Sequence, residues 1–143
     1  MKTIEQITAY GHENILCTHG TTIEITKDNH LSIKGNCILG INASKACFDL
    51  NNELKAIISK GKKIKVTLKV ENITETFYGF GSEKLLLLDK KDIVFRKSSF
   101  ICDRTILINC TKSSSDLSRD IIKLLNNPVK KITITFQLNE ADE

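Results

Sequence analysis

Long apolar stretches and aromatic residues are scarce in this sequence. It has no Trp, one Pro and one Met, and its aromatic residues are six Phe and two Tyr among 143 residues. The longest aliphatic run, Leu85–Leu88, is far shorter than the roughly 20 apolar residues that cross a bilayer. Met1–Glu5 carries an acid and begins a strand pattern, unlike the apolar core of a signal peptide. We therefore expect no membrane-spanning helix and a cytoplasmic protein.

Motifs of several common sites are also missing. The five cysteines form no C-x-x-C pair, whereas structural zinc sites draw ligands from cysteines two to four residues apart. We interpret them as buried thiols, which pack as small hydrophobic groups. The chain contains neither G-x-x-x-x-G-K-[ST] nor G-x-G-x-x-G, which argues against nucleotide binding by those routes.

The composition is that of one soluble globular domain. Hydrophobic residues make up 41% of the chain and charged residues 27%. A chain of 143 residues can bury a core without disulfides. The formal net charge of +4 permits an anionic partner, although lysines on a solvated surface are the commoner explanation.

The strongest feature of the sequence is an internal repeat. Ile41–Lys45 (INASK) recurs in diverged form as Ile108–Lys112 (INCTK), 67 residues later. Farther upstream the repeat is fainter: Thr8–Gly11 resembles Thr76–Gly79 at a spacing of 68, and Ile23–Ile25 aligns with Ile93–Phe95 at 70. We infer a single domain, 1–143, built from two halves of about 70 residues, 1–70 and 71–138, with an acidic tail at 139–143.

The apolar pattern predicts the elements of each half. Apolar residues spaced three and four apart predict helices at 47–58 and 117–125. Alternating apolar residues predict strands, including a hairpin with arms at 15–18 and 22–27, in which Gly20 supplies a positive φ. Because each helix has one apolar stripe, both must lie on a sheet. We expect an α+β fold with two helices and a curved, mainly antiparallel sheet, and its closure into a barrel stays open.

Polar residues present in only one half are the candidates for function. In the alignment of the halves, three such residues of the first half lie opposite residues of another type: His12 opposite Phe80, His19 opposite Asp89 and Glu24 opposite Val94. They fall in the predicted Gly11–Lys27 hairpin. We predict that this hairpin binds a small polar or anionic ligand. The proposed ligand-binding residues are Thr21, Thr22, Thr26, Lys27, Lys45, Arg104 and Lys112.

Several of these segments resemble a known family. Gly11–Ile15, Thr21–Lys27, Gly35–Ile38 and Arg104–Ile106, with the helical region 112–128, are similar to an archaeal family, domain of unknown function number 371. The resemblance covers nearly the whole chain. It implies an archaeal origin and a small cytosolic domain, without an established activity.

A metal-dependent hydrolase is the first alternative. His12, His19 and Glu24 offer imidazole and carboxylate groups that suit a divalent ion such as zinc, or acid–base catalysis. Their spacing matches no established ligand motif. The plainer interpretation is that both histidines are structural residues of loops and that Glu24 lies on a solvated strand face.

RNA binding and subunit assembly are two further alternatives. Lys45 and Lys112 are related by the repeat and precede the two helices, where they could contact phosphate or form structural ion pairs. The aromatic residues are not interleaved with basic residues along the sequence, as base-stacking platforms require. For assembly, Leu85–Leu88 would be a natural interface segment in a homo-oligomer if it were exposed.

Overall fold

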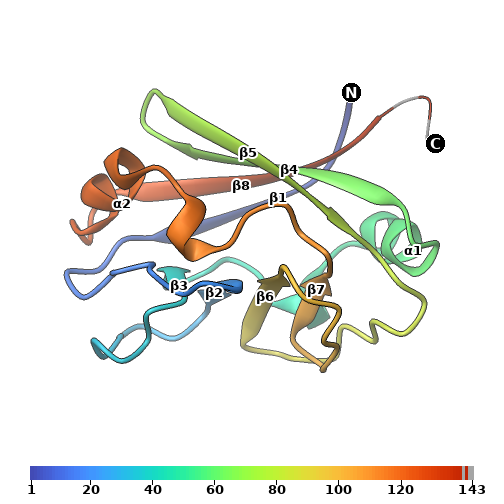
Figure 1. The fold of residues 1–143 in the computed structure, drawn as a ribbon, viewed down its shortest axis with the longest axis horizontal. Helices are drawn as coiled ribbons and strands as arrows, with labels where there is room; N and C mark the ends of the chain where they lie inside the picture. Colours follow the sequence, from blue (N-terminus) through green and yellow to red (C-terminus); the bar gives the residue numbers. More distant parts are fainter. Residues whose placement is uncertain (140, 142–143) are drawn as a thin grey trace.

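The protein consists of two four-stranded sheets that pack face to face, with a helix at each end (Figure 1). This computed structural model describes residues 1–139 and 141, so the predicted acidic tail lies largely outside the described residues. The elements in chain order are β1 (Lys2–Tyr10), β2 (Thr22–Thr26), β3 (Ile38–Gly40), α1 (Asn52–Ser59), β4 (Lys63–Val70), β5 (Ile73–Phe80), β6 (Asp92–Arg96), β7 (Thr105–Leu107), α2 (Arg119–Leu125) and β8 (Lys131–Leu138).

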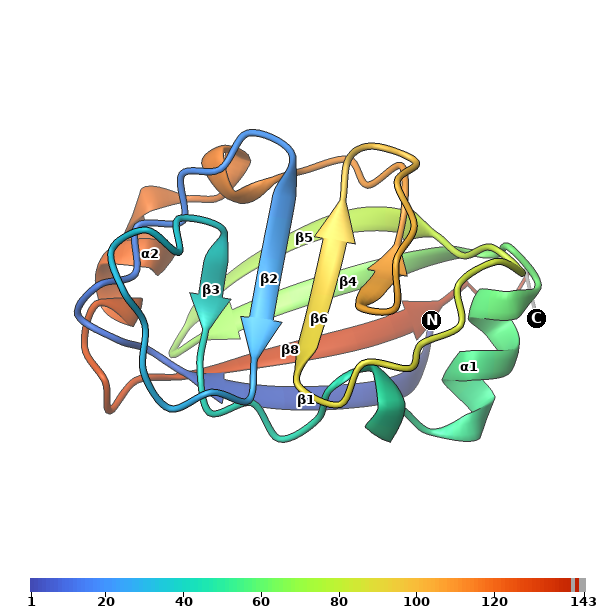
Figure 2. The same ribbon diagram turned by 90° about the horizontal axis from the view of Figure 1, so that it is seen from below.

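The two sheets differ in strand direction. Sheet A has the order β1-β8-β4-β5, and all three of its ladders are antiparallel. Sheet B has the order β3-β2-β6-β7, in which the central β2–β6 ladder is antiparallel and the two outer ladders are parallel. Figure 2 shows the strands of sheet B crossing those of sheet A steeply. The α+β class and the two helices are confirmed, although the strands form two open sheets instead of one.

The core lies between the two sheets. Alternate residues of each strand point inward, because successive side chains of a strand lie on opposite faces. Phe95 of β6 occupies the centre, edge-on to Phe77 at 5.3 Å and stacked on Phe136 at 6.0 Å between ring centroids. Leu54 of α1 and Ile121 of α2 complete the core at its two ends. Within the described residues, no helix has the length and apolar character needed to cross a membrane.

The repeated motif marks the same backbone turn in both halves. Asn42 and Asn109 have φ values of 52° and 50°, in the left-handed region that Asn tolerates better than most residues. Ser44 bonds the backbone of Thr8 through its amide and its hydroxyl, and Thr111 bonds Tyr78 in the same way. The sequence motif therefore repeats because the turn needs Asn, followed two residues later by a hydroxyl.

These bonds correct the alignment of the amino-terminal part of each half. Thr8 corresponds to Tyr78, a spacing of 70, and not to Thr76. The spacing falls from 70 to 67 because the loop between β6 and β7 is shorter than the loop between β2 and β3. His12 therefore corresponds to Ser82 instead of Phe80. Both side chains accept a hydrogen bond from the amide two residues later.

The predicted hairpin at 15–18 and 22–27 is wrong. Residues 15–18 form no strand, and β2 pairs instead with β3 and β6. Ile15 and Cys17 are buried because their loop packs on the core, whereas Leu16 between them is exposed. Gly20 does not have a positive φ, and the left-handed residue of this loop is Cys17.

Both helices begin later than the apolar pattern indicated. Cys47–Asp49 forms a short 3₁₀ turn, and α1 starts after Asn51, whose side chain accepts from the amide of Leu54. The second helix repeats this arrangement with a turn at Ser114–Asp116 and an N-cap at Ser118. Asn51 accepts from the amide of Leu54 and Ser118 from the amide of Asp120, so capping decides where each helix begins.

The leucine run is half buried. Leu85 and Leu87 are in the core, whereas Leu86 and Leu88 are exposed. The segment belongs to no strand. Its role in assembly stays a prediction.

Two glycines provide a matched test of this packing. A Cβ at Gly81 would collide with the backbone carbonyl of Ile58 at the end of α1, whereas a Cβ at Gly20 would meet nothing within 4 Å. We expect Gly81→Ala to lower the free energy of unfolding by about 2 kcal/mol or more, because backbone atoms must move. Gly20→Ala should be neutral or slightly stabilising. Urea unfolding followed by circular dichroism measures both, and equal effects would contradict the structure.

Candidate functional site

The outward face of sheet B carries a group of buried polar residues. Thr22, Glu24 and Thr26 of β2 alternate with core residues and point away from sheet A. Each lies directly opposite a residue of β6: Thr22 opposite Arg96, Glu24 opposite Val94 and Thr26 opposite Asp92. This face is turned toward the viewer in Figure 2, where β2 and β6 run side by side. The central ladder thus places acids from both halves next to one another.

Arg104 joins these two acids. Its Nη1 donates to Glu24 Oε1 at 3.0 Å and to Asp92 Oδ2 at 3.3 Å. The Arg104 side chain is 43% exposed, whereas those of Glu24 and Asp92 are 10% and 8% exposed. We call Glu24, Asp92 and Arg104 the acid–arginine cluster. In this cluster the partly exposed guanidinium of Arg104 is bound by the buried carboxylates of Glu24 and Asp92.

Burial changes the protonation of the cluster. The pKa of Glu24 is raised from 4.5 to about 7, first by burial and then by the nearby charge of Asp92. Arg104, Lys91 and Arg96 act in the opposite direction but do not outweigh these two effects. Near neutral pH Glu24 is therefore protonated in a large fraction of molecules, and in these Asp92 alone balances the positive charge of Arg104.

Asp92 has an unmet hydrogen-bonding need. Its Oδ1 is buried and is the one such side-chain atom, among residues 1–139 and 141, without a hydrogen-bond partner. A buried acceptor left without a donor costs about 1–3 kcal/mol. Such an atom is unusual in a folded protein, and a bound ligand that donates a hydrogen bond would satisfy it.

A second arginine extends the charged face. Arg96 donates through Nε to the Thr105 hydroxyl at 2.8 Å and through Nη2 to the sulfur of Cys102 at 3.4 Å. Its guanidinium also lies 4.8 Å from the ring centre of Phe100. Although burial raises the pKa of Cys102, hydrogen bonds involving Thr105, the backbone of Arg104 and Arg96 lower it overall. The face therefore carries two arginines around one acid pair.

The side chains of both predicted site histidines accept hydrogen bonds from backbone amides of their own loops. His12 Nδ1 accepts from the amide of Asn14 at 3.0 Å. His19 Nδ1 accepts from the amides of Thr21 and Thr22, each at 3.2 Å. A neutral ring that accepts at Nδ1 carries its proton on Nε2, which then has no lone pair for a metal.

The metal alternative gains no support from this arrangement. Glu24 is bound to Arg104, and neither histidine contacts it. In the described part of the chain, no group of three His, Cys, Asp or Glu residues is placed to hold a metal ion. The site of His12, His19 and Glu24 remains a prediction from the sequence.

The three predicted lysines lie in ion pairs that occur in both halves. Lys45 binds Glu5 at 3.0 Å, and its counterpart Lys112 binds Glu75 at 2.9 Å. Lys27 binds Asp49, the acid of the first 3₁₀ turn. These contacts match the structural role considered for Lys45 and Lys112. Ligand binding by these lysines stays a prediction.

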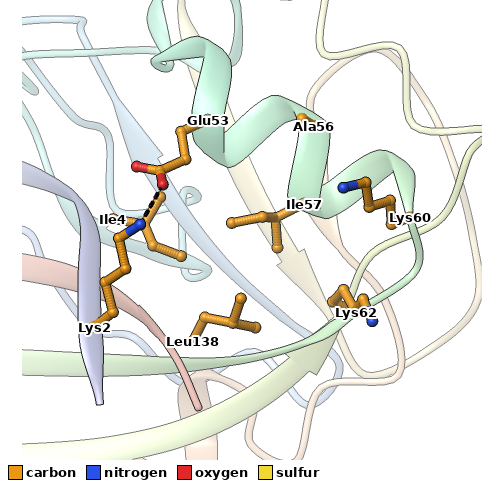
Figure 3. A pocket seen from close by; sticks show the side chains of 8 residues that line it. All are labelled: Lys2, Ile4, Glu53, Ala56, Ile57, Lys60, Lys62 and Leu138. Atoms are coloured by element: carbon orange, nitrogen blue, oxygen red, sulfur yellow. Dashed lines mark hydrogen bonds and ion pairs between the residues drawn. The ribbon is translucent and has the colours of Figure 1, made fainter. Parts of the chain in front are cut away.

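A groove lies beside each helix. The groove at α1 has a volume of about 290 Å³, with Ile4, Ile57 and Leu138 along its floor and Lys60 and Lys62 at its rim (Figure 3). Across its mouth, Lys2 bonds Glu53 at 2.7 Å. The groove at α2 is lined by the corresponding elements and includes Asp120, Lys123 and Lys130. Neither groove contains a predicted site residue.

The sequence identified only part of the cluster. Glu24 and Arg104 were among the predicted residues, and Thr22 and Thr26 lie beside them. Asp92 and Arg96 were not among the predicted site residues, although the alignment of Ile23–Ile25 with Ile93–Phe95 places them on the polar face. What the sequence does not reveal is that β2 pairs with β6, which brings the two polar faces together.

The structure defines a small two-sheet α+β domain with a charged outward face. The model of the family described as "Domain of unknown function (DUF371)" matches residues 7–139, so the chain belongs to this family. It is also similar to the uncharacterised protein MJ0206 of Methanocaldococcus jannaschii, with 45% identity over 119 residues. That alignment covers 83% of this chain and 88% of the relative. The resemblance inferred from the sequence is confirmed.

The raised pKa of Glu24 predicts a change of stability with pH. Between pH 4.5 and about 7 the folded state holds a proton on Glu24 that the unfolded state has released. The free energy of unfolding should therefore fall as pH rises through this range, by roughly 1–3 kcal/mol. Glu24→Gln should remove this decrease, whereas the exposed control Glu83→Gln should keep it. Urea unfolding from pH 5 to 8 measures the slopes, and an unchanged slope in Glu24→Gln would contradict the assignment.

Proposed function

We propose that this protein binds a small anionic ligand at the acid–arginine cluster. The observation that carries the proposal is that a partly exposed guanidinium lies beside a buried carboxylate oxygen without a partner, Asp92 Oδ1. Perturbed titratable groups and unmet hydrogen bonds gather at functional sites more often than elsewhere. The proposal keeps the ligand class expected from the sequence and moves the centre of the site from a hairpin to the face of sheet B.

The charges around the cluster favour an anion. Arg104 bonds the two acids through Nη1 alone in the contacts of the described residues, and a guanidinium has five N–H donors in a planar fork. Its outer edge suits a carboxylate or phosphate group bound by two parallel bonds. Lys91 and Arg96 add positive charge within electrostatic range of Glu24. Partial protonation of Glu24 removes negative charge that would repel the ligand.

The unpaired oxygen, Asp92 Oδ1, further restricts the class of ligand. Asp92 Oδ1 can only accept a hydrogen bond when the carboxylate is ionised, so a ligand that meets its need must carry a donor. A hydroxyl or amide N–H next to the anionic group fits this requirement. We therefore favour small hydroxycarboxylates or sugar phosphates over simple inorganic anions. A metal-dependent hydrolase would need ligands that the described residues do not bring together.

Thermal shift measurements with lactate, citrate, glycerol phosphate and inorganic phosphate test the proposal. A bound probe at a hundredfold its Kd stabilises the folded state by about 2.7 kcal/mol, which raises Tm by several degrees. We expect the largest rise with a probe that combines an anion and a hydroxyl. Binding should weaken as pH rises above 7, because Glu24 becomes ionised.

Variants separate the cluster from general charge effects. Arg104→Gln should abolish the rise in Tm, Arg104→Lys should keep part of it, and Lys112→Gln, which loses one positive charge at a structural ion pair, should keep all of it. Each rise is measured against the ligand-free Tm of the same variant. Equal rises in Arg104→Gln and wild type would exclude the cluster as the site.

A further inference from the structure

The outward face of sheet A differs from the rest of the surface in its charges. Every second residue of its four strands points away from the core, and these positions are exposed or half-buried. Among them are Lys63, Lys65 and Lys69 of β4 and Lys131 of β8. The other outward positions are Thr, Gln, Tyr and Phe, and no carboxylate occurs on this face. We infer that the outward face of sheet A binds single-stranded RNA.

The positive charge of this face is not neutralised by ion pairs among the described residues. None of its four lysines forms an ion pair within residues 1–139 and 141, unlike Lys45 and Lys112. Glu71 in the β4–β5 turn lies beside Lys69 and Lys131 but is bonded to Lys130. An ordinary solvated surface mixes charges of both signs. A face with lysines alone instead matches the evenly charged backbone of a nucleic acid.

Strand pairing places aromatic rings among these lysines. Along the sequence the rings and the basic residues are separate, yet Tyr78 lies opposite Lys65, and Tyr10 lies opposite Lys131. The Nζ of Lys63 is 4.6 Å from the ring centre of Tyr78. Unpaired bases stack on exposed rings while lysines bind the neighbouring phosphates. The interleaving that is absent along the sequence is therefore present across the strands.

The uncharged residues suit RNA more than a protein partner. Thr67 lies between Thr76 and Thr135, and Gln6 lies next to Thr135. Hydroxyl and amide groups both donate and accept, so they can bond phosphate oxygens and the 2′-hydroxyl that distinguishes RNA from DNA. Gln6, Thr67 and Thr135 line a shallow hollow of about 370 Å³, together with Lys69, Lys131, Thr133 and, at the β4–β5 turn, Glu71. A protein interface would instead need an apolar centre.

The size of the face agrees with a short single strand. Four strands spaced about 4.8 Å apart give a surface roughly 14 Å wide, and eight residues give a length of roughly 26 Å. Such a surface accommodates a few unpaired nucleotides. The bases of a duplex stack on one another and have no free face. Stacking on Tyr78 therefore requires an unpaired strand.

Fluorescence anisotropy with a labelled oligouridine of about 12 nucleotides tests the inference. We expect binding at low salt, with the logarithm of the binding constant falling against log salt at a slope of about −2 to −3 for three or four phosphate contacts. Lys65→Glu/Lys69→Glu should weaken binding at least tenfold, and Tyr78→Ala about fivefold. Single-stranded DNA of the same sequence should bind more weakly than RNA.

The control carries the same change of charge elsewhere. Lys34→Glu/Lys84→Glu alters two exposed lysines outside sheet A and takes the formal net charge from +4 to 0, as the face variant does. The RNA affinity of this control should stay within about twofold of wild type, because only the long-range attraction set by net charge is weakened. Circular dichroism verifies the fold of each variant, and Lys63→Gln/Lys131→Gln tests the face without charge reversal. Absent binding at low salt, or equal weakening by both double Glu variants, overturns the inference, and equal affinity for DNA overturns its assignment to RNA.

Discussion

The structure depends on the backbone hydrogen bonds of sheet A, because every ladder in that sheet joins one half of the chain to the other. β1 pairs with β8, β8 with β4, and β4 with β5. Neither half alone can therefore satisfy the amides and carbonyls of its long strands, and unpaired buried groups of this kind are costly. This constraint supports our proposal that the chain is one cooperative domain, even though its sequence divides into two similar halves.

The same constraint creates the acid–arginine cluster. β2 and β6 are the strands through which the two halves meet in sheet B. Glu24 comes from the first half, whereas Asp92 and Arg104 come from the second. The cluster therefore needs residues of both halves, whereas the candidates His12, His19 and Glu24 all come from the first half. In the corrected alignment, the counterparts of the three residues are Val94, Thr22 and Cys37, so only one of two equivalent places on the face is charged.

The sequence predicted what local patterns decide. The two apolar helices follow from short-range spacing, and the repeat gave Lys45 and Lys112 a shared position that suits structural ion pairs. It failed at residues 15–18, where an apolar run predicted a strand but Ile15 and Cys17 are buried in a loop that packs on the core. It also could not give strand pairing, on which both proposed surfaces rest. Duplication of an ancestral half stays a prediction, which the matched turns and ion pairs of the two halves support.

Separate halves of the chain test the central claim most directly. When residues 1–71 and 72–143 are produced as two fragments, each should give the poorly dispersed NMR spectrum of an unfolded chain, because its long strands lack their partners. An equimolar mixture should recover the amide spectrum of the intact protein, including the signals of Glu24 and Arg104. A native-like, dispersed spectrum from either fragment alone would contradict the account.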